Sequence, residues 1–230
     1  MNSVLLLAGG TGSRMGAEIP KQFLLVDGEP IIVHTMRVLE QQPEVDRIAA
    51  VCIDGWTEKL WEYAEKAGIT KLDLVVLGGG TRYESTRYGM EALETADEDV
   101  IVVHDAARPL VTSESLSDVI RVCHEKGNSM AVLECVDTMY AREAGGTTSM
   151  VLDRSGMVRG QTPEAVTGNR MREMYAAADE KGVANDSISA LQIELGWPIH
   201  FAKGSVRNIK LTRTEDLALF EMILKARKKI

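Results

Sequence analysis

The sequence predicts one α/β domain, a single Rossmann-like and mostly parallel sheet with helices on both faces, from which a β-arm protrudes. Short apolar runs alternate with longer amphipathic ones from Val4 to Glu134, as in consecutive βαβ units. The short runs are continuous, as in Val100–Val103, which is typical of strands buried on both faces. A change of pattern between residues 136 and 162 predicts the arm.

Each expected element follows from its local pattern. Strands are expected at five short apolar runs, the first of which leads into a glycine-rich turn. Helices are expected at four segments with apolar residues at helical spacing, and Gly68 and Gly127 mark the ends of two of them. The expected strands are Val4–Ala8, Arg47–Ile53, Leu72–Leu77, Val100–Val103 and Met130–Glu134. The expected helices are Ile31–Gln42, Thr57–Ala67, Arg82–Glu94 and Ser113–Lys126.

The segment 136–162 interrupts this alternation. Met139–Arg142 and Thr147–Leu152 are candidate strands, and the pair Gly145-Gly146 between them is a hairpin signal. An arm of this kind is unstable alone and needs a partner surface. We therefore treat residues 1–230 as one domain with 136–162 as an extended arm.

Composition narrows the class of protein. The 230 residues carry a formal net charge of −8 and are 45% hydrophobic, so we expect a sizeable core and no nucleic-acid-binding face. Cys52, Cys123 and Cys135 lack CxxC spacing, which favours free thiols in a reducing compartment. The apolar run Val4–Ala8 is too short for a membrane span or a signal peptide. We expect a cytoplasmic protein without a membrane partner, and we interpret the basic residues within Lys225–Ile230 as a helix end.

The first chemical signal is the glycine-rich turn that follows the first strand, where backbone N–H groups can approach a phosphate. A P-loop needs Gly-Lys-Ser/Thr, but Gly16 is followed by Ala17. The dinucleotide fingerprint needs a glycine where Met15 stands. What remains is a glycine-rich loop with two cations, Arg14 and Lys21, a combination suited to a triphosphate.

Six segments, taken in order, resemble one family of enzymes. The first is Leu-Ala-Gly-Gly-Thr-Gly-Ser-Arg-Met-Gly at 7–16, with Pro-Lys-Gln at 20–22. The others are Gly-Gly-Gly-Thr-Arg-Tyr-Glu-Ser at 78–85, His-Asp-Ala-Ala-Arg-Pro at 104–109, Asp-Thr at 137–138, Gln-Thr-Pro at 161–163 and Asn-Ile-Lys-Leu-Thr at 208–212. In order and spacing they resemble the 2-C-methyl-D-erythritol 4-phosphate cytidylyltransferase family and its near relative, ribitol-5-phosphate cytidylyltransferase, over about residues 4–222.

The resemblance implies transfer of a cytidylyl group from CTP to a polyol phosphate, with Mg²⁺ or another divalent cation, and release of pyrophosphate. A phosphate monoester has a second pKa of about 6, so it is mostly anionic at neutral pH and needs no general base. The site must then supply alignment and positive charge. The absence of a recognisable His/Ser/Asp triad in the sequence agrees with this chemistry.

The family pattern also implies a role for each site residue. The expected catalytic residues, which act on the triphosphate and the reacting phosphates, are Arg14, Lys21 and Lys210. Asp105 is expected to hold Mg²⁺, because hard cations prefer carboxylate oxygen, and His104 is assigned no catalytic role. The expected nucleotide-binding residues are Ala8, Gly9, Gly10, Gly79, Gly80, Arg82, Ser85 and Ala106. The expected acceptor-binding residues, some of them from the arm of a neighbouring subunit in a homodimer, are Arg108, Thr138, Arg154 and Thr162.

Three departures from the family pattern concern the acceptor. Gly80 stands where the erythritol-phosphate enzymes commonly have Asp, and Asn185-Asp186-Ser187 stands where they show Thr-Asp-Glu/Asp. Glu164 replaces the Gln that usually follows Gln-Thr-Pro. Segments 9–12, 54–56 and 160–161 favour the ribitol-phosphate relatives, whereas segments 104–109 and 207–219 favour the erythritol-phosphate enzymes. We rank 2-C-methyl-D-erythritol 4-phosphate first and ribitol 5-phosphate second.

Three other classes are weaker interpretations. A hexose-phosphate nucleotidyltransferase that uses UTP, GTP or dTTP is disfavoured by the short chain and the 104–109 segment. A non-catalytic nucleotide-binding module is disfavoured because Arg14, Lys21, Asp105 and Lys210 are all present. A nicotinamide oxidoreductase is disfavoured by the glycine spacing.

Overall fold

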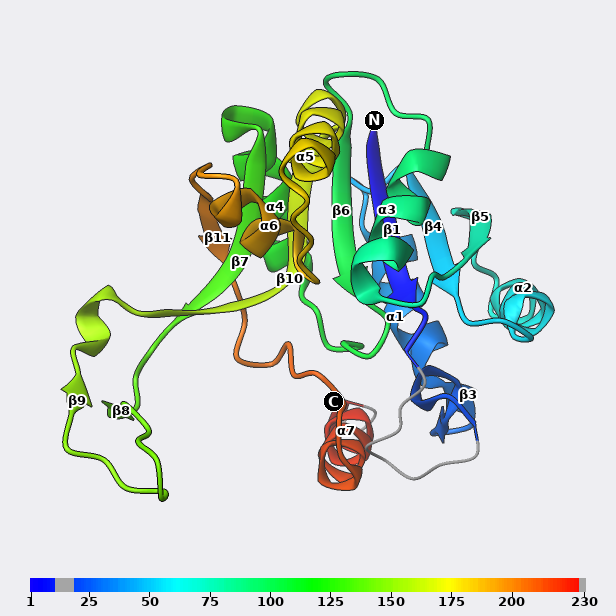
Figure 1. The fold of residues 1–230 in the computed structure, drawn as a ribbon. Coiled ribbons are helices and arrows are strands. Elements are labelled where there is room, and N and C mark those ends of the chain that lie inside the picture. Colours follow the sequence, from blue (N-terminus) through cyan, green and yellow to red (C-terminus); the bar gives the residue numbers. More distant parts are fainter. Residues whose placement is uncertain (11–18, 228–230) are drawn as a thin grey trace.

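The computed structural model describes residues 1–10 and 19–227, and Figure 1 shows their fold. One large sheet contains, in spatial order, β11 (Phe201–Lys203), β7 (Asn128–Glu134), β10 (Val158–Thr167), β6 (Val100–Asp105), β1 (Asn2–Ala8), β4 (Arg47–Cys52) and β5 (Leu72–Leu77). Within this sheet β10 runs antiparallel to its neighbours β6 and β7, and the other pairings are parallel. The predicted mostly parallel α/β sheet is confirmed.

Helices cover both faces of the sheet. One face carries α1 (Ile31–Gln41), α2 (Thr57–Lys66) and α4 (Ser113–Lys126), and the other carries α3 (Arg82–Ala92), α5 (Gly168–Lys181) and α6 (Ile188–Glu194). Side chains of successive strand residues point to opposite faces of the sheet. Leu6 therefore packs with the first set of helices and Leu5 with the second. Strands buried on both sides have no polar face, which explains their continuous apolar runs. In the described part of the chain, no helix combines the length and apolar character needed to cross a bilayer.

The close approach of α3 to the sheet depends on Gly89. A Cβ added there would lie 2.5 Å from Cδ1 of Leu5 and 2.6 Å from Cγ2 of Val51. Contacts this short exclude any side chain, so glycine lets the helix pack directly on β1 and β4. Because α3 carries Arg82 and Ser85 in its first turns, this contact also positions the site.

The strands and helices expected up to Glu134 are all present, with ends within two residues of the expected ones. Between β1 and α1 the structure adds the 3-10 turn η2 (Lys21–Phe23) and the short pair β2 (Leu25–Val26) and β3 (Glu29–Pro30). From Val158 onward it adds β10, α5, α6 and β11, which were not predicted. The final helix, α7 (Thr214–Arg227), was predicted only at its basic end, and it packs through Phe220 on a small core beside α1.

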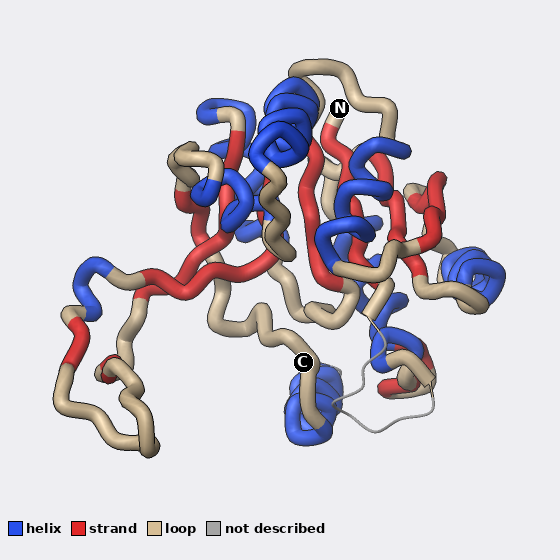
Figure 2. Tube along the Cα trace, viewed as in Figure 1, coloured by secondary structure: helices blue, strands red, loops and turns tan. Residues whose placement is uncertain are grey.

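The arm leaves the sheet after β7 and returns as β10 (Figures 1 and 2). Its two short strands, β8 (Met139–Tyr140) and β9 (Val151–Leu152), pair antiparallel, and the 3-10 turn η3 (Arg154–Gly156) follows. Gly145 and Gly146 both have positive φ in the connection between them, as the hairpin signal predicts. The paired segments are shorter than the expected strands, and β10 joins the sheet already at Val158, within the range 136–162.

Candidate active site

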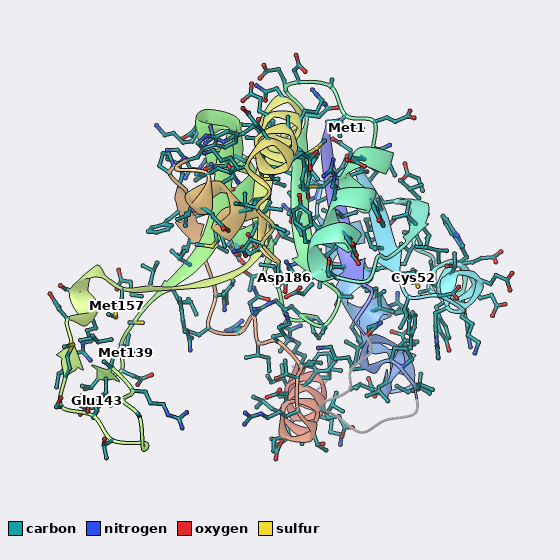
Figure 3. The ribbon with its side chains drawn as sticks, in the orientation of Figure 1. Met1, Cys52, Met139, Glu143, Met157 and Asp186 are labelled. Atoms are coloured by element: carbon teal, nitrogen blue, oxygen red, sulfur yellow. The ribbon has the colours of Figure 1, made fainter. Side chains whose placement is uncertain are left out.

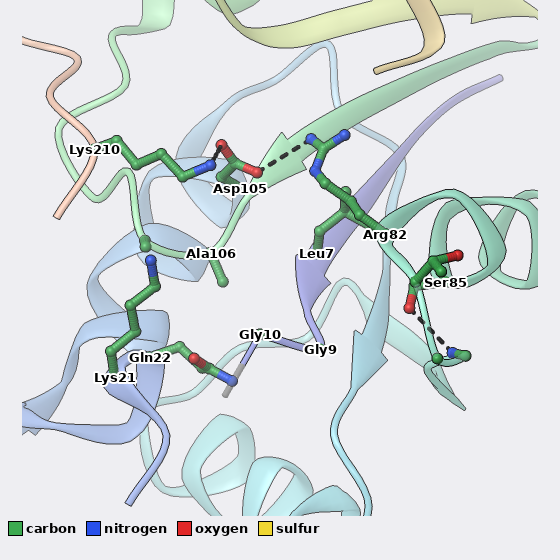
Figure 4. A pocket seen from close by; sticks show the side chains of 14 residues that line it. Leu7, Gly9, Gly10, Lys21, Gln22, Arg82, Ser85, Asp105, Ala106 and Lys210 are labelled. Atoms are coloured by element: carbon green, nitrogen blue, oxygen red, sulfur yellow. Dashed lines mark hydrogen bonds and ion pairs between the residues drawn. The ribbon is translucent and has the colours of Figure 1, made fainter. Parts of the chain in front are cut away.

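Three loops, which follow β1, β5 and β6, meet at the edge of the sheet where the parallel strands end. The chain runs outward from β1 to β4 and β5, then returns to β6 on the other side of β1. Ligands of such sheets bind where the strand order reverses in this way. A cavity of about 370 Å³ opens at this point, a size typical of small-molecule sites. Its lining residues, shown in Figure 4, are Leu7, Gly9, Gly10, Lys21, Gln22, Gly79, Gly80, Thr81, Arg82, Ser85, Asp105, Ala106, Ala107 and Lys210.

Asp105, at the end of β6, is the centre of a charged cluster. Its Oδ2 lies 2.9 Å from Nζ of Lys210 and 3.3 Å from Nε of Arg108. Its Oδ1 lies 3.2 Å from Nη2 of Arg82. In Figure 4, Lys210 and Arg82 reach the carboxylate from opposite sides. One buried carboxylate therefore pairs with three cations, and positive charge is in excess.

The charge state of Asp105 follows from these neighbours. Burial alone would raise the pKa of Asp105, but the charges of Lys210, Arg82 and Arg108 outweigh burial and hold this pKa well below its usual range. The adjacent His104 is fully buried, and burial lowers its pKa to about 4. Its Nε2–H donates to the carbonyl of Arg108 at 3.2 Å. At neutral pH Asp105 is therefore ionised and the adjacent His104 is neutral. The hydrogen bond from His104 to Arg108 stabilises the loop after β6.

The loop between β5 and α3 forms another wall of the cavity. Thr81 and Glu84 cap α3 reciprocally: the Thr81 hydroxyl accepts from the Glu84 N–H (3.1 Å), and the Glu84 carboxylate accepts from the Thr81 N–H (3.0 Å). The Ser85 hydroxyl accepts from the N–H of Gly79 at 3.0 Å. A Cβ on Gly79 would lie 2.5 Å from Cβ of Glu84, so the turn requires glycine. A rigid glycine loop at a helix N-terminus suits a polar or anionic ligand.

Gln22 attaches η2 to the end of β1. Its side chain is buried, and Nε2 donates to the carbonyl of Ala8 at 2.6 Å. This bond holds η2 beside the cavity, where Lys21 contributes to the lining.

A hydrogen-bond network around Asn208 positions Lys210. Asn208 is fully buried, and its Nδ2 donates to the carbonyl of Thr162 at 2.7 Å. Its own carbonyl accepts from Nη1 of Arg108 (2.7 Å) and from Nε2 of Gln161 (3.3 Å). The segment that carries Lys210 is therefore tied to both β10 and the loop after β6, which keeps the lysine at Asp105.

The structure brings most of the expected site residues together. Those that line the cavity are Gly9, Gly10, Lys21, Gly79, Gly80, Arg82, Ser85, Asp105, Ala106 and Lys210. Ala8, Arg108 and Thr162 lie behind its wall, and the Thr162 hydroxyl accepts from the N–H of Asp105 at 3.2 Å. Thr138 and Arg154 are exposed on the arm, outside the cavity, and Arg14 lies outside the described residues.

Several residues of the site were not predicted from the sequence. Leu7, Gln22, Thr81 and Ala107 line the cavity without having been expected there. All four lie within the motifs quoted above, so position within a motif could have identified them as site residues. The carbonyl of Asp186 accepts from Nη1 of Arg82, a contact that no local pattern indicated.

The donors available for a metal ion are few. Asp105 is the acidic residue among the described residues that line the cavity. Across residues 1–10 and 19–227, no group of three or more His, Cys, Asp or Glu side chains could hold a metal ion. Mg²⁺ commonly binds through one or two carboxylates together with substrate phosphates and water. Asp105 fits that mode of binding, with the remaining ligands coming from a nucleotide.

Comparison with known proteins identifies the family. The family model "IspD: 2-C-methyl-D-erythritol 4-phosphate cytidylyltransferase" matches residues 2–226. The chain belongs to the IspD family. The ribitol-5-phosphate cytidylyltransferase of Lacticaseibacillus paracasei is 36% identical to it over 98% of both chains. The 2-C-methyl-D-erythritol 4-phosphate cytidylyltransferase of Syntrophus aciditrophicus is 36% identical, over 95% of this chain and 93% of its own.

A solved structure of the IspD family shares the fold. The crystal structure of 2-C-methyl-D-erythritol 4-phosphate cytidylyltransferase from Thermus thermophilus matches with a TM-score of 0.78 at 25% identity, covering 98% of this chain and 100% of that one. The resemblance inferred from the sequence motifs is confirmed. The names of the relatives include both of the acceptors that the sequence analysis ranked.

Proposed function

We propose that this protein transfers the cytidylyl group of CTP to 2-C-methyl-D-erythritol 4-phosphate, giving the CDP-polyol and pyrophosphate. The observation that carries the proposal is the charge pattern of the cavity. Lys21, Lys210 and Arg82 line it around Asp105, the one carboxylate among its described lining residues, whose oxygens pair with cations. Such a cavity attracts a polyanion and stabilises phosphate charge, and it does not depend on a general base.

The reaction needs only alignment and charge. A phosphate oxygen of the acceptor forms a bond to the α-phosphorus of CTP, and the bond from that phosphorus to the bridging oxygen breaks. Pyrophosphate leaves with the electron pair. We assign Lys21 and Lys210 to the charge that develops on the reacting phosphates, with Arg14 as a third cation from outside the described residues.

The glycine loops are the proposed nucleotide side. Gly9 and Gly10 follow β1, and Gly79 and Gly80 precede α3, so backbone groups from two loops face one cavity. A Cβ on Gly10 would meet nothing within 4 Å among the described residues, which leaves room for a ligand there. Backbone groups and the Ser85 hydroxyl can select a base by matching its hydrogen-bonding edge. We assign Ala8, Arg82 and Ala106 to the same side.

We assign the divalent cation to Asp105. When bound there, Mg²⁺ would neutralise part of the phosphate charge. Asp105 supplies the hard oxygen donor, and its lowered pKa keeps it ionised. Lys210 and Arg82, which pair with Asp105 in this structure, then have the phosphate oxygens as alternative partners.

Ribitol 5-phosphate is the second candidate acceptor. It is supported by segments 9–12, 54–56 and 160–161, which resemble the ribitol-phosphate relatives. Arg108 of the loop after β6 and Thr162 of β10 both contact Asp105 and are the proposed acceptor-binding residues of the cavity. Both acceptors are short polyol phosphates and need a cationic pocket of similar size.

The test of the acceptor compares kcat/KM for the two polyol phosphates with CTP and Mg²⁺. We expect the higher value with 2-C-methyl-D-erythritol 4-phosphate. Turnover confined to ribitol 5-phosphate would reverse the ranking and keep the class of enzyme. No pyrophosphate with either acceptor would contradict the enzymatic function.

We further propose a homodimer in which the arm completes the neighbouring site. Thr138 and Arg154 are assigned to acceptor binding, yet both are exposed on the arm, outside the cavity of their own chain. The arm also exposes apolar side chains, including Val136, Tyr140 and Val151. Apolar groups on an arm with little pairing of its own call for a partner surface.

We infer a cytoplasmic location. Cys52, Cys123 and Cys135 are free, and the first two are buried. Free thiols are usual in a reducing compartment.

A further inference from the structure

Glu164 of β10 is a buried carboxylate for which the proposed mechanism has no use. It is only 4% exposed. Its Oε2 accepts from the hydroxyl of Ser187 at 2.8 Å and from the N–H of Ser189 at 2.9 Å. Burying a carboxylate is costly unless hydrogen bonds compensate for the lost water. These two bonds therefore attach the start of α6 to the central sheet.

Ser187 is the point where several bonds converge. It is the N-cap of α6, and its Oγ accepts from the N–H of Ala190 at 3.2 Å while donating its own hydrogen to Glu164. Its N–H donates to Oδ1 of Asn185 at 3.3 Å, which closes a tight turn. The segment Asn185–Ser187 is thus fixed by hydrogen bonds to the sheet, to the first turn of α6 and within the segment itself.

This segment reaches the active site through Asp186. The carbonyl of Asp186 accepts from Nη1 of Arg82, and Nη2 of the same guanidinium pairs with Asp105. Figure 3 labels Asp186 in the body of the molecule, well apart from the arm. β10 lies on the opposite side of β6 from β1, so Glu164 lies on the side away from the Gly9–Gly10 loop, whereas Arg82 begins α3 beside Gly79 and Gly80. The chain of contacts therefore runs from the β10 side of the sheet to a residue that is assigned to the nucleotide.

Both positions in the contact are departures from the erythritol-phosphate pattern noted above. That pattern has an amide at position 164 and a carboxylate at position 187. This chain has the carboxylate at Glu164 and a hydroxyl at Ser187. Either arrangement keeps one carboxylate at the contact, whereas two would repel each other in a buried place. The charge-assisted hydrogen bond is therefore kept, but in this chain the acid stands at position 164 and not at position 187.

We propose that Glu164 is a positioning residue which, through Ser187, holds the segment Asn185–Ser187 against Arg82 and so sets how tightly the two substrates bind. The inference rests on the proposed function in one respect, that the acceptor is a polyol phosphate. Glu164 contacts neither substrate nor the reacting atoms. Its influence passes through Ser187 and Asp186 to Arg82, which is assigned to the nucleotide, and on to Asp105, which Arg108 and Thr162 also contact. It therefore falls on the KM of both substrates and spares kcat.

The test moves the carboxylate from position 164 to position 187. Ser187→Glu sets a second carboxylate against Glu164, and we expect the acceptor KM to rise about tenfold and the CTP KM to rise with it, while kcat changes less than about threefold. The double variant Glu164→Gln/Ser187→Glu restores an amide–carboxylate pair and is expected to bring the acceptor KM back to within about threefold of wild type. Ser187→Gln is the control of matched size without the charge, with an acceptor KM expected below that of Ser187→Glu.

The rate of amide hydrogen exchange over residues 183–190 reports on the same contact and does not require catalytic turnover. We expect faster exchange in Ser187→Glu and recovery in the double variant. If the wild-type protein makes no product with any polyol phosphate, the proposed function fails, while this comparison still decides whether Glu164 holds the segment. Should Ser187→Glu not fold, Glu164→Gln alone is expected to raise the acceptor KM by about threefold, and an unchanged KM would refute the proposal.

Three results would overturn the inference. One is an equal acceptor KM for Ser187→Glu and Ser187→Gln. Another is a double variant that recovers neither the acceptor KM nor the hydrogen exchange. The third is an effect confined to Tm and kcat, which would make the contact merely structural.

Discussion

At the scale of single residues, Asp105 shows how charge and burial compete at this site. Burial favours a neutral acid, yet Lys210, Arg82 and Arg108 lie within 3.3 Å of its oxygens and keep it ionised. The same cations are the groups that a triphosphate needs. In this structure they pair with the carboxylate, and in the proposed function their excess positive charge would attract the substrate.

Lys21→Ala tests whether the cations act on the reaction. We expect kcat/KM to fall about 100-fold, because one aligned charge stabilises the transition state by about 3 kcal/mol. Steady-state release of pyrophosphate measures it. Lys66→Ala, which removes an exposed lysine on α2, is the control and should change the rate less than about twofold. A near-normal rate for Lys21→Ala would mean that Lys21 is only a surface lysine.

At the scale of elements, the start of α7 anchors the segment that carries Lys210. Oδ2 of Asp216 accepts from the N–H of Thr212 (2.8 Å) and of Arg213 (2.9 Å). Burial raises the pKa of Asp216, but these hydrogen bonds outweigh it and lower this pKa below its usual value. A depressed pKa in the folded state means that the added stability is present above about pH 4 and is lost as the pH falls through the folded value.

Asp216→Ala is therefore expected to lower the free energy of unfolding by about 1–2 kcal/mol at pH 7. The difference from wild type should shrink as the pH falls below about 4. Urea unfolding at pH 7 and pH 3 measures both. Glu221→Ala, an exposed change within α7, should alter stability by about 0.5 kcal/mol or less. A deficit of the same size at both pH values would contradict a role for the ionised carboxylate.

The elements differ in how far the sequence could predict them. Those up to Glu134 were predictable because strands buried on both faces leave continuous apolar runs. β10 was not, because it contains Gly160 and Pro163 and its pairing with β7 is irregular between Gln161 and Glu164. α5 could have been predicted, since its buried residues Met171, Met174, Tyr175 and Ala178 recur at helical spacing.

The site divides in the same way. Lys21, Asp105 and Lys210 could be identified because their chemical types stand in recognisable motifs. The contact from Arg82 to Asp186 joins residues 104 positions apart, so no local pattern contains it. The contact from Glu164 to Ser187 appeared in the sequence only as two separate departures, and the fold is what makes them neighbours.

At the scale of the whole molecule, the arm is the part for which we propose a second chain. Its exposed apolar groups and its two-residue strands offer little stability of their own. A dimer would cover these groups and carry Thr138 and Arg154 to the neighbouring cavity. Two-fold symmetry would then give each dimer two shared sites.

Mixing two inactive variants tests this sharing. Arg154→Ala impairs the arm's contribution and Lys210→Ala impairs the cavity, and each is expected to lose most activity alone. In a mixed dimer one site carries both defects and the other carries neither. Random exchange of equal amounts should restore about one quarter of the wild-type sites. Activity no greater than the sum of the separate variants would indicate that the arm does not serve a neighbouring site.

The identity of the nucleotide product decides whether this protein transfers a cytidylyl group. The protein is incubated with CTP, Mg²⁺ and each polyol phosphate, and mass spectrometry follows the nucleotide product while pyrophosphate is quantified in the same sample. We expect a CDP-polyol and pyrophosphate in equal amounts, with little product when UTP or ATP replaces CTP. Release of pyrophosphate without a CDP-polyol, or equal product from every nucleotide, would contradict it.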